Sequence, residues 1–213
     1  MMKHFAIIMV AALGALLATV PGALAHDTIC TSNLTGVTIV GNVIVPNGQS
    51  CTLGYDPPAS TLCCGQAPPG TVVTVTGNVM VGQGSSLTVG LNSIISGNIL
   101  ANNCNYVELV SEGAEFVGGN VQIVGCQGQT SFLSTGTDSQ ISGNLQCEYS
   151  GACVLEGADV SGNVQVMNGV SGSPSEIYDN TINENLQCYN NRPPPIGSNN
   201  VVSGNEQGQC AGF

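Results

Sequence analysis

The sequence predicts an all-β, single-domain protein: a right-handed parallel β-helix of about eight coils that carries a ladder of asparagine side chains. Three observations predict this fold. A short phrase built around Gly-Asn occurs eight times, most copies lie about 20 residues apart, and apolar residues alternate with others after each asparagine. A strand of a few residues cannot bury its apolar face alone, whereas stacked copies bury each other's faces. The right-handed winding is what we expect for parallel β-helices as a class.

Each copy of the phrase has Ile or Val three residues before the asparagine, and the first seven copies have apolar residues one and three positions after it. This alternation is the period of a β-strand. The residue before the asparagine is Gly in every copy but one, where it is Glu184, and we expect this glycine to supply a backbone angle that other residues reach only at a cost. Recurring asparagines can hydrogen-bond along a stack. The predicted ladder contains Asn42, Asn78, Asn98, Asn120, Asn144, Asn163, Asn185 and Asn205.

An interval of about 20 residues fits one coil of three short strands and three turns, with a rise of roughly 4.8 Å per coil. Further strands are visible between the asparagines at 50–53, 87–89, 106–109 and 152–155. Two positions after the asparagine, the last five copies have glutamine, which predicts a second, outward ladder. An antiparallel sandwich also uses many short strands, but it has no reason to repeat one phrase at coil spacing.

The first 25 residues have the pattern of a secretory signal peptide. Lys3 and His4 precede an apolar run over 5–20, and Ala23-Leu24-Ala25 is a small-residue cleavage site. No later stretch approaches the ~20 apolar residues of a membrane-spanning helix. We therefore predict that residues 26–213 form the exported domain, which is periplasmic or extracellular and is not inserted in a membrane.

The chain is acidic, with a formal net charge of −11 at pH 7. After residue 25, Arg192 is the only Lys or Arg. A chain of this sign is repelled by nucleic acid and by anionic lipid surfaces, so neither is an expected partner.

All ten cysteines follow residue 25, which favours disulfides in an oxidising compartment over a metal site, because paired spacing and a second histidine are missing. Cys104 and Cys126 both lie six residues after a ladder asparagine in neighbouring coils, within bonding reach of each other. Cys63 and Cys64 either bond to each other or exchange with the N-terminal pair. The full set of expected pairs is Cys104–Cys126, Cys30–Cys51, Cys147–Cys153, Cys188–Cys210 and Cys63–Cys64.

Two segments depart from the repeat. Residues 54–70 contain four prolines and two cysteines, as expected for a surface insertion, which either binds a ligand or is a disulfide-pinned decoration. The last copy has Glu206 and Gly208 at its inward positions. A charge on the last rung discourages pairing with another chain, and terminal repeats of solenoids are expected to deviate in this way.

Catalytic machinery is sparse in the sequence. His26 is the only histidine after residue 25, and nucleophilic catalysis needs a positioned base. Four acidic residues fall near one edge of successive coils, and they could form a carboxylate pair for glycoside cleavage, a weak Ca²⁺ site, or only a solvated acidic edge. These residues are Glu115, Asp138, Asp159 and Asp179. We predict a structural or surface-interaction module that is not an enzyme and has no cofactor, with a glycan or a cell-surface component as partner. The alternative is a carbohydrate-binding or polysaccharide-cleaving β-helix that uses the acidic edge.

The phrases VSGNVQV and ISGNLQC and the ending SGNEQGQCAGF resemble secreted bacterial GN-repeat proteins of unknown function. The resemblance runs from about residue 36 to the end. It implies an exported bacterial β-helix and carries no activity or catalytic residues. The chain is more loosely similar to bactofilins, cytosolic β-helix proteins that polymerise end to end, but the leader, the cysteines and Glu206 depart from that pattern.

Overall fold

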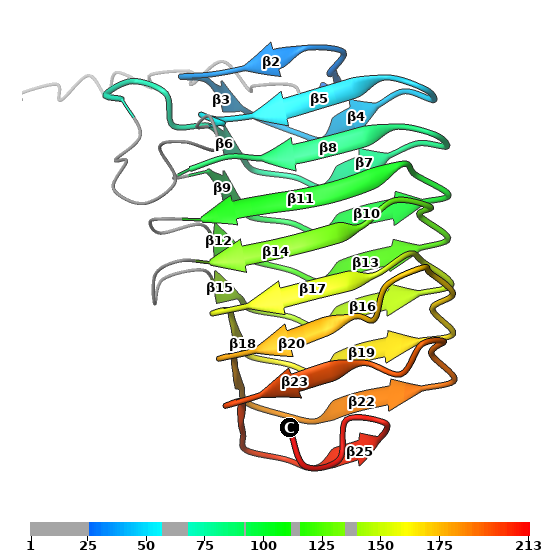
Figure 1. Cartoon of the computed structure of the whole chain (residues 1–213). Coiled ribbons are helices and arrows are strands. Elements are labelled where there is room, and N and C mark those ends of the chain that lie inside the picture. The colour runs from blue at the N-terminus through cyan, green and yellow to red at the C-terminus, as the bar shows by residue number, and fades with distance from the viewer. Residues whose placement is uncertain (1–25, 57–67, 92, 112–115, 135–139) are drawn as a thin grey trace, which may run out of the picture.

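Three parallel β-sheets wind into a solenoid in the computed structural model, which describes residues 26–56, 68–91, 93–111, 116–134 and 140–213 (Figure 1). The described residues contain no helix, and therefore none that is long and apolar enough to cross a membrane. Each sheet takes one strand from each coil, so that strands adjacent in a sheet are one coil apart in sequence. The predicted all-β parallel solenoid is confirmed.

The first sheet, sheet A, has nine strands and contains the residues that follow each ladder asparagine. Its strands are β1 (Thr28–Ile29), β4 (Val43–Val45), β7 (Val79–Val81), β10 (Ile99–Asn102), β13 (Val121–Val124), β16 (Leu145–Glu148), β19 (Val164–Met167), β22 (Leu186–Tyr189) and β25 (Glu206–Gly208). Sheet B has eight strands, which include those expected between the asparagines. They are β2 (Asn33–Leu34), β5 (Ser50–Leu53), β8 (Ser86–Val89), β11 (Tyr106–Ser111), β14 (Thr130–Ser134), β17 (Cys153–Glu156), β20 (Glu176–Tyr178) and β23 (Ile196–Ser198).

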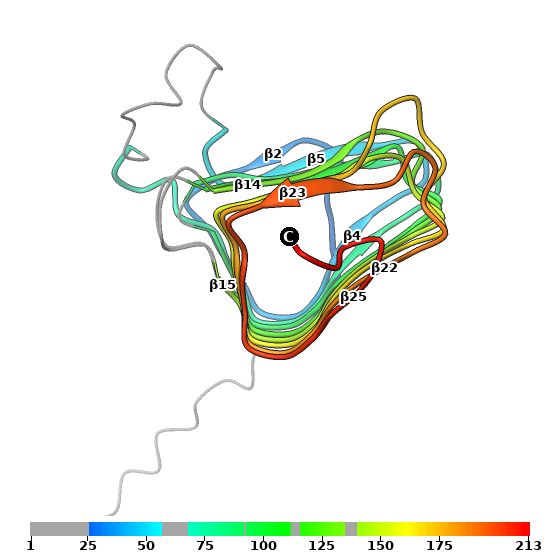
Figure 2. The same ribbon diagram turned by 60° about the horizontal axis from the view of Figure 1, so that its bottom comes forward.

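Sheet C has eight strands of two residues each, and they hold the Ile or Val that precedes each asparagine by three positions. They are β3 (Thr38–Ile39), β6 (Thr74–Val75), β9 (Ile94–Ile95), β12 (Phe116–Val117), β15 (Gln140–Ile141), β18 (Asp159–Val160), β21 (Thr181–Ile182) and β24 (Val201–Val202). Seen towards its end, the solenoid has a triangular cross-section (Figure 2). The Gly-Asn dipeptide of each phrase is the corner between sheets C and A.

The core fills this triangle with stacked aliphatic side chains. In sheet A, the residue directly after each ladder asparagine pairs with its counterpart one coil away, and these side chains are fully buried in seven successive coils. They are Val43, Val79, Ile99, Val121, Leu145, Val164 and Leu186. Because each strand is only two to six residues long, burial between coils rather than within a coil stabilises the structure.

The glycine of the repeat is explained by close packing, which corrects the expectation of a special backbone angle. Among the seven glycines that precede ladder asparagines, only Gly41 has a positive φ. A Cβ on Gly97 would instead lie 2.7 Å from the carbonyl carbon of Gly77 and 2.8 Å from Oδ1 of Asn78 in the preceding coil. Glycine therefore lets successive corners approach closely enough for their asparagines to bond.

Four disulfides link the solenoid, and they are four of the five expected pairs. Three of them join cysteines 21 or 22 residues apart, while the fourth spans six residues between β16 and β17. The four pairs are Cys30–Cys51, Cys104–Cys126, Cys147–Cys153 and Cys188–Cys210, with Cα–Cα distances of 4.4–6.5 Å. Four disulfides fit an oxidising compartment. The fifth expected pair, Cys63–Cys64, lies outside the described residues, as do residues 57–67 of the insertion and the predicted leader, residues 1–25.

The two ends of the solenoid differ. At the C-terminal end the chain turns into the triangular cross-section, where Phe213 packs against the core (Figure 2). The backbone N–H of Asn200 donates to the carbonyl oxygen of Phe213, and the N–H of Gly212 donates to the Glu206 carboxylate over 2.8 Å. The C-terminal tail thus covers the last coil. This cap comes in addition to the charge of Glu206, which the sequence places on the last strand. At the other end, Ile29 is exposed on the first strand.

Candidate functional site

The structure describes two of the four residues of the expected acidic edge. Asp159 lies on β18, where it pairs with Gln140 in the preceding coil and with Thr181 in the next. Asp179 precedes Thr181 by two residues and occupies the corner before β21 with a φ of 58°. The two carboxylates therefore do not share a register position. Glu115 and Asp138 lie outside the described residues.

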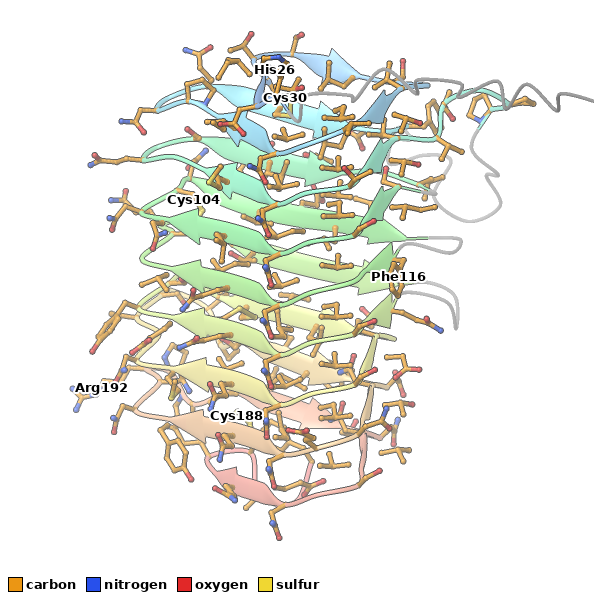
Figure 3. All side chains as sticks on the ribbon, turned by 180° about the vertical axis from the view of Figure 1, so that it is seen from behind. His26, Cys30, Cys104, Phe116, Cys188 and Arg192 are labelled. Carbon is orange, nitrogen blue, oxygen red and sulfur yellow. A yellow bond between two sulfur atoms is a disulfide. The ribbon has the colours of Figure 1, made fainter. Side chains whose placement is uncertain are left out.

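Metal-ligating side chains do not gather in the described part of the chain, where no group of three or more His, Cys, Asp or Glu residues could hold a metal ion. Oδ1 of Asp159 is buried without a hydrogen-bond partner among these residues. His26 and Arg192, the two basic side chains described, lie in different coils far apart along the solenoid (Figure 3). Neither of these described basic side chains forms an ion pair with Asp159 or Asp179.

One carboxyl group has a perturbed pKa. Glu108 projects outward from β11 and is half-buried, and its backbone is in register with Thr88 of β8 and Ser131 of β14. Burial raises the pKa of Glu108, and the negative charge of Asp56 raises it further. The folded state therefore binds the proton of Glu108 more tightly than the unfolded state does.

We expect Glu108→Gln to stabilise the fold at pH 7 and to have no such effect at about pH 3. A raised carboxyl pKa contributes stability below the unfolded pKa of about 4.3 and loses it as the pH rises through the folded pKa. The glutamine removes the buried charge and hence that loss. Thermal melting of both proteins at the two pH values measures the difference, and Asp56→Asn should produce a smaller gain because its charge is the lesser cause. An equal gain at both pH values would contradict this assignment.

The most regular polar feature is the corner ladder, formed by the eight asparagines predicted from the sequence. Oδ1 of every asparagine but the last accepts two hydrogen bonds from the next asparagine, one from its backbone N–H and one from its side-chain amide. Seven such links run without interruption from Asn42 to Asn205, with lengths of 2.8–3.2 Å to the backbone nitrogen and 2.9–3.3 Å to Nδ2. At the N-terminal end, Nδ2 of Asn42 donates to Asp27 over 2.9 Å.

A second row of amides, the glutamine row, runs beside the corner ladder on the outer face of sheet A. Its members pair in register from coil to coil. They are Gln122, Gln146, Gln165, Gln187 and Gln207. Unlike the expected ladder, the row is interrupted: Gln122 donates to Gln146, but Gln146 donates to the carboxylate of Glu148 rather than to Gln165.

The bonding resumes below this interruption. Gln165 donates to Gln187 over 2.7 Å, and Gln187 donates to Gln207 over 3.1 Å. Because nothing in the described chain donates to Oε1 of Gln165 or of Gln122, each segment of the glutamine row begins with a carbonyl oxygen that faces solvent unpaired.

The corner ladder and the glutamine row enclose a groove of about 480 Å³, which we call the amide groove. Its wall on one side is made by four ladder asparagines, and its other side by the first three glutamines and by Leu100. The lining contains no ionisable side chain and consists of Asn98, Asn120, Asn144, Asn163, Gln122, Gln146, Gln165, Leu100 and Val121. In an acidic chain, this face offers hydrogen-bonding groups without charge.

Sequence reasoning missed two shorter amide stacks at the other corners. Asn180, which is 1% exposed, donates from its backbone N–H and from Nδ2 to Oδ1 of Asn200. Asn191 donates in the same way to Oε1 of Gln209, over 2.8 and 3.1 Å. A usable signal was present for the first stack, since both asparagines directly precede a two-residue strand of sheet C. The short stacks satisfy buried backbone groups and leave the amide groove as the open polar surface.

Comparisons with protein-family profiles, with curated proteins and with solved structures found no match to this chain. Its class is therefore defined by the fold and by its polar rows: a disulfide-linked parallel β-solenoid with an asparagine ladder along one corner and an uncharged groove beside it.

Proposed function

We propose that this protein is exported and acts as a structural or surface-interaction module rather than as an enzyme. The observation that carries the proposal is the amide groove. Its side chains are carboxamides, which donate and accept hydrogen bonds but do not titrate, and so they cannot act as general acids or bases. A surface of this kind binds a partner without transforming it.

Rigidity supports the same proposal. Every amide of the groove is mounted on a strand or corner that is bonded to the coils on both sides, and disulfides tie four pairs of positions together. Preorganised groups lose little conformational entropy when a partner binds. Export, with removal of residues 1–25, supplies the oxidising compartment that the disulfides require.

Export and lack of catalysis are tested together in the organism's own cells. We expect the protein in the periplasmic or extracellular fraction, with an N-terminus near His26, and we expect no release of reducing ends from a polysaccharide panel with or without Ca²⁺. A matched variant, Asp138→Asn with Asp159→Asn, tests the acidic edge. Reduced cytosolic protein would refute export, and reducing-end release that is lost in the double variant would establish the polysaccharide-cleaving alternative.

A further inference from the structure

We propose that the amide groove binds an uncharged, extended polysaccharide whose chain runs along the solenoid axis. The proposal deepens the proposed function, because it names the chemistry of the partner. It rests on what the groove leaves unsatisfied, on its lack of charge and on its repeat distance.

The groove presents donors along one side. A carboxamide nitrogen carries two hydrogens. Asn98, Asn120 and Asn144 each use one of them for the preceding asparagine of the corner ladder, and no other acceptor in the described chain takes the second. Their Oδ1 atoms already accept two bonds each. This side of the groove therefore offers one fixed N–H donor from each of these three asparagines and no free acceptor, while Asn163 gives its second hydrogen to Glu184.

The other side presents acceptors. Because Gln146 turns to Glu148, Oε1 of Gln165 accepts no bond among the described residues, and the same holds for Oε1 of Gln122 at the start of the glutamine row. A hydroxyl group both donates and accepts. A ligand with many hydroxyls can thus bond to the donor side and the acceptor side at once, whereas a ligand with only acceptors or only donors leaves one side unsatisfied.

Charge decides which glycans fit. The groove lining holds no ionisable side chain, while Glu148 and Glu184 stand beside it, bonded to Gln146 and Asn163 respectively. An acidic polysaccharide would be repelled by these carboxylates and would find no cation to pair with. An uncharged chain meets neither penalty.

The repeat distance fits as well. Coils in a parallel sheet are spaced by ~4.8 Å, which is close to the length that one pyranose unit adds to an extended glycan chain. Each sugar of such a chain can therefore lie opposite one coil. Leu100, half-buried in the same row as the glutamines, offers an apolar contact to the C–H face of a sugar at one end of the groove.

The test measures binding of the oxidised protein to a linear β-glucan, a xylan and a mannan, with polygalacturonate and alginate as acidic controls, by titration calorimetry. We expect at least one uncharged chain to bind and both acidic chains to bind at least tenfold more weakly. Gln165→Leu and Gln122→Leu should each weaken binding about tenfold, because each removes the unpaired Oε1 that accepts a hydrogen bond from the glycan.

Gln207→Leu is the matched control. It changes the same residue type in the same row, but outside the groove, and should leave binding unchanged. Leucine is compatible with this row, since Leu100 already occupies it in β10. Melting curves show whether each variant keeps the wild-type fold.

Three outcomes would overturn the proposal: no uncharged chain binds, both groove variants bind like wild type, or Gln207→Leu loses binding equally. A fourth outcome that would overturn it is self-association through the amide groove in a protein that binds no glycan. This would be seen as a concentration-dependent sedimentation coefficient, and Gln165→Leu would abolish that dependence. The proposed function fails separately. Release of reducing ends would refute the proposed function. If the protein is exported and retained on cell surfaces but binds no glycan, the proposed function stands and only the glycan proposal fails.

Discussion

Replacing Asn78 with leucine should lower the free energy of unfolding by about 2–4 kcal/mol. Oδ1 of Asn78 accepts the side-chain amide of Asn98 over 2.9 Å, and it also accepts the backbone N–H of Asn98 over 2.9 Å. Leucine leaves both donors without a partner at a half-buried corner, and each unsatisfied donor costs about 1–3 kcal/mol. The backbone donor is fixed in place by the strands on both sides and cannot turn away.

Guanidinium denaturation, followed by circular dichroism, measures this loss. The control is Asn205→Leu at the end of the same ladder, where Oδ1 accepts no bond among the described residues, so that the loss should stay below about 1 kcal/mol. Equal destabilisation by the two variants would show that asparagine acts through its corner conformation and not through the bonds between coils.

Removing the disulfide between Cys104 and Cys126 should cost about 3 kcal/mol, because the bond closes a loop of about 22 residues and restricts the unfolded chain. Both cysteines are buried, so the variant Cys104→Ala with Cys126→Ala also tests whether the core tolerates the smaller side chains. Chemical denaturation under oxidising conditions, with the other disulfides intact, measures the difference in unfolding free energy.

The Cys147–Cys153 bond provides an internal comparison. Both of its cysteines are buried as well, but only six residues separate them, so the same double alanine change should cost about 2 kcal/mol. In this comparison, the predicted ranking of the two disulfides by their loss of unfolding free energy depends only on the length of the loop that each one closes. If the shorter loop lost more, strain or packing in the folded state would dominate over chain entropy.

The repeat register accounts for most of what the sequence could predict. Once stacking fixes one position, every residue at the same distance from the asparagine must lie in one row, and the corner ladder and Cys104–Cys126 follow directly. The same logic predicted the glutamine row but not its interruption. A glutamine side chain is long enough to choose between two acceptors, and the choice of Glu148 by Gln146 depends on a neighbour within the strand rather than on the register.

Other features could not be predicted from the sequence because they depend on distances in space. The repeated glycine is favoured by the short distance between successive corners, a quantity that a residue pattern does not contain, although the corner with Glu184 keeps both bonds between Asn185 and Asn163. The amide groove arises from two rows that are adjacent in space and from the depth between them. Counting from the asparagines places Asp159 four residues before Asn163 and Asp179 six residues before Asn185, and the pairing of Asp159 with Thr181 keeps this offset of two positions.

The direction of the corner ladder disfavours end-to-end stacking of two copies of the molecule. Every amide in it points its nitrogen towards the first coil and its oxygen towards the last, so that the column has a positive and a negative pole. Asp27 neutralises the positive pole, while Asn205 leaves the negative pole bare. Two molecules placed head to tail would set a carboxylate against an amide oxygen, with no hydrogen between them to share. We therefore expect the length of the particle to be set by the number of repeats in one chain and not to grow with concentration.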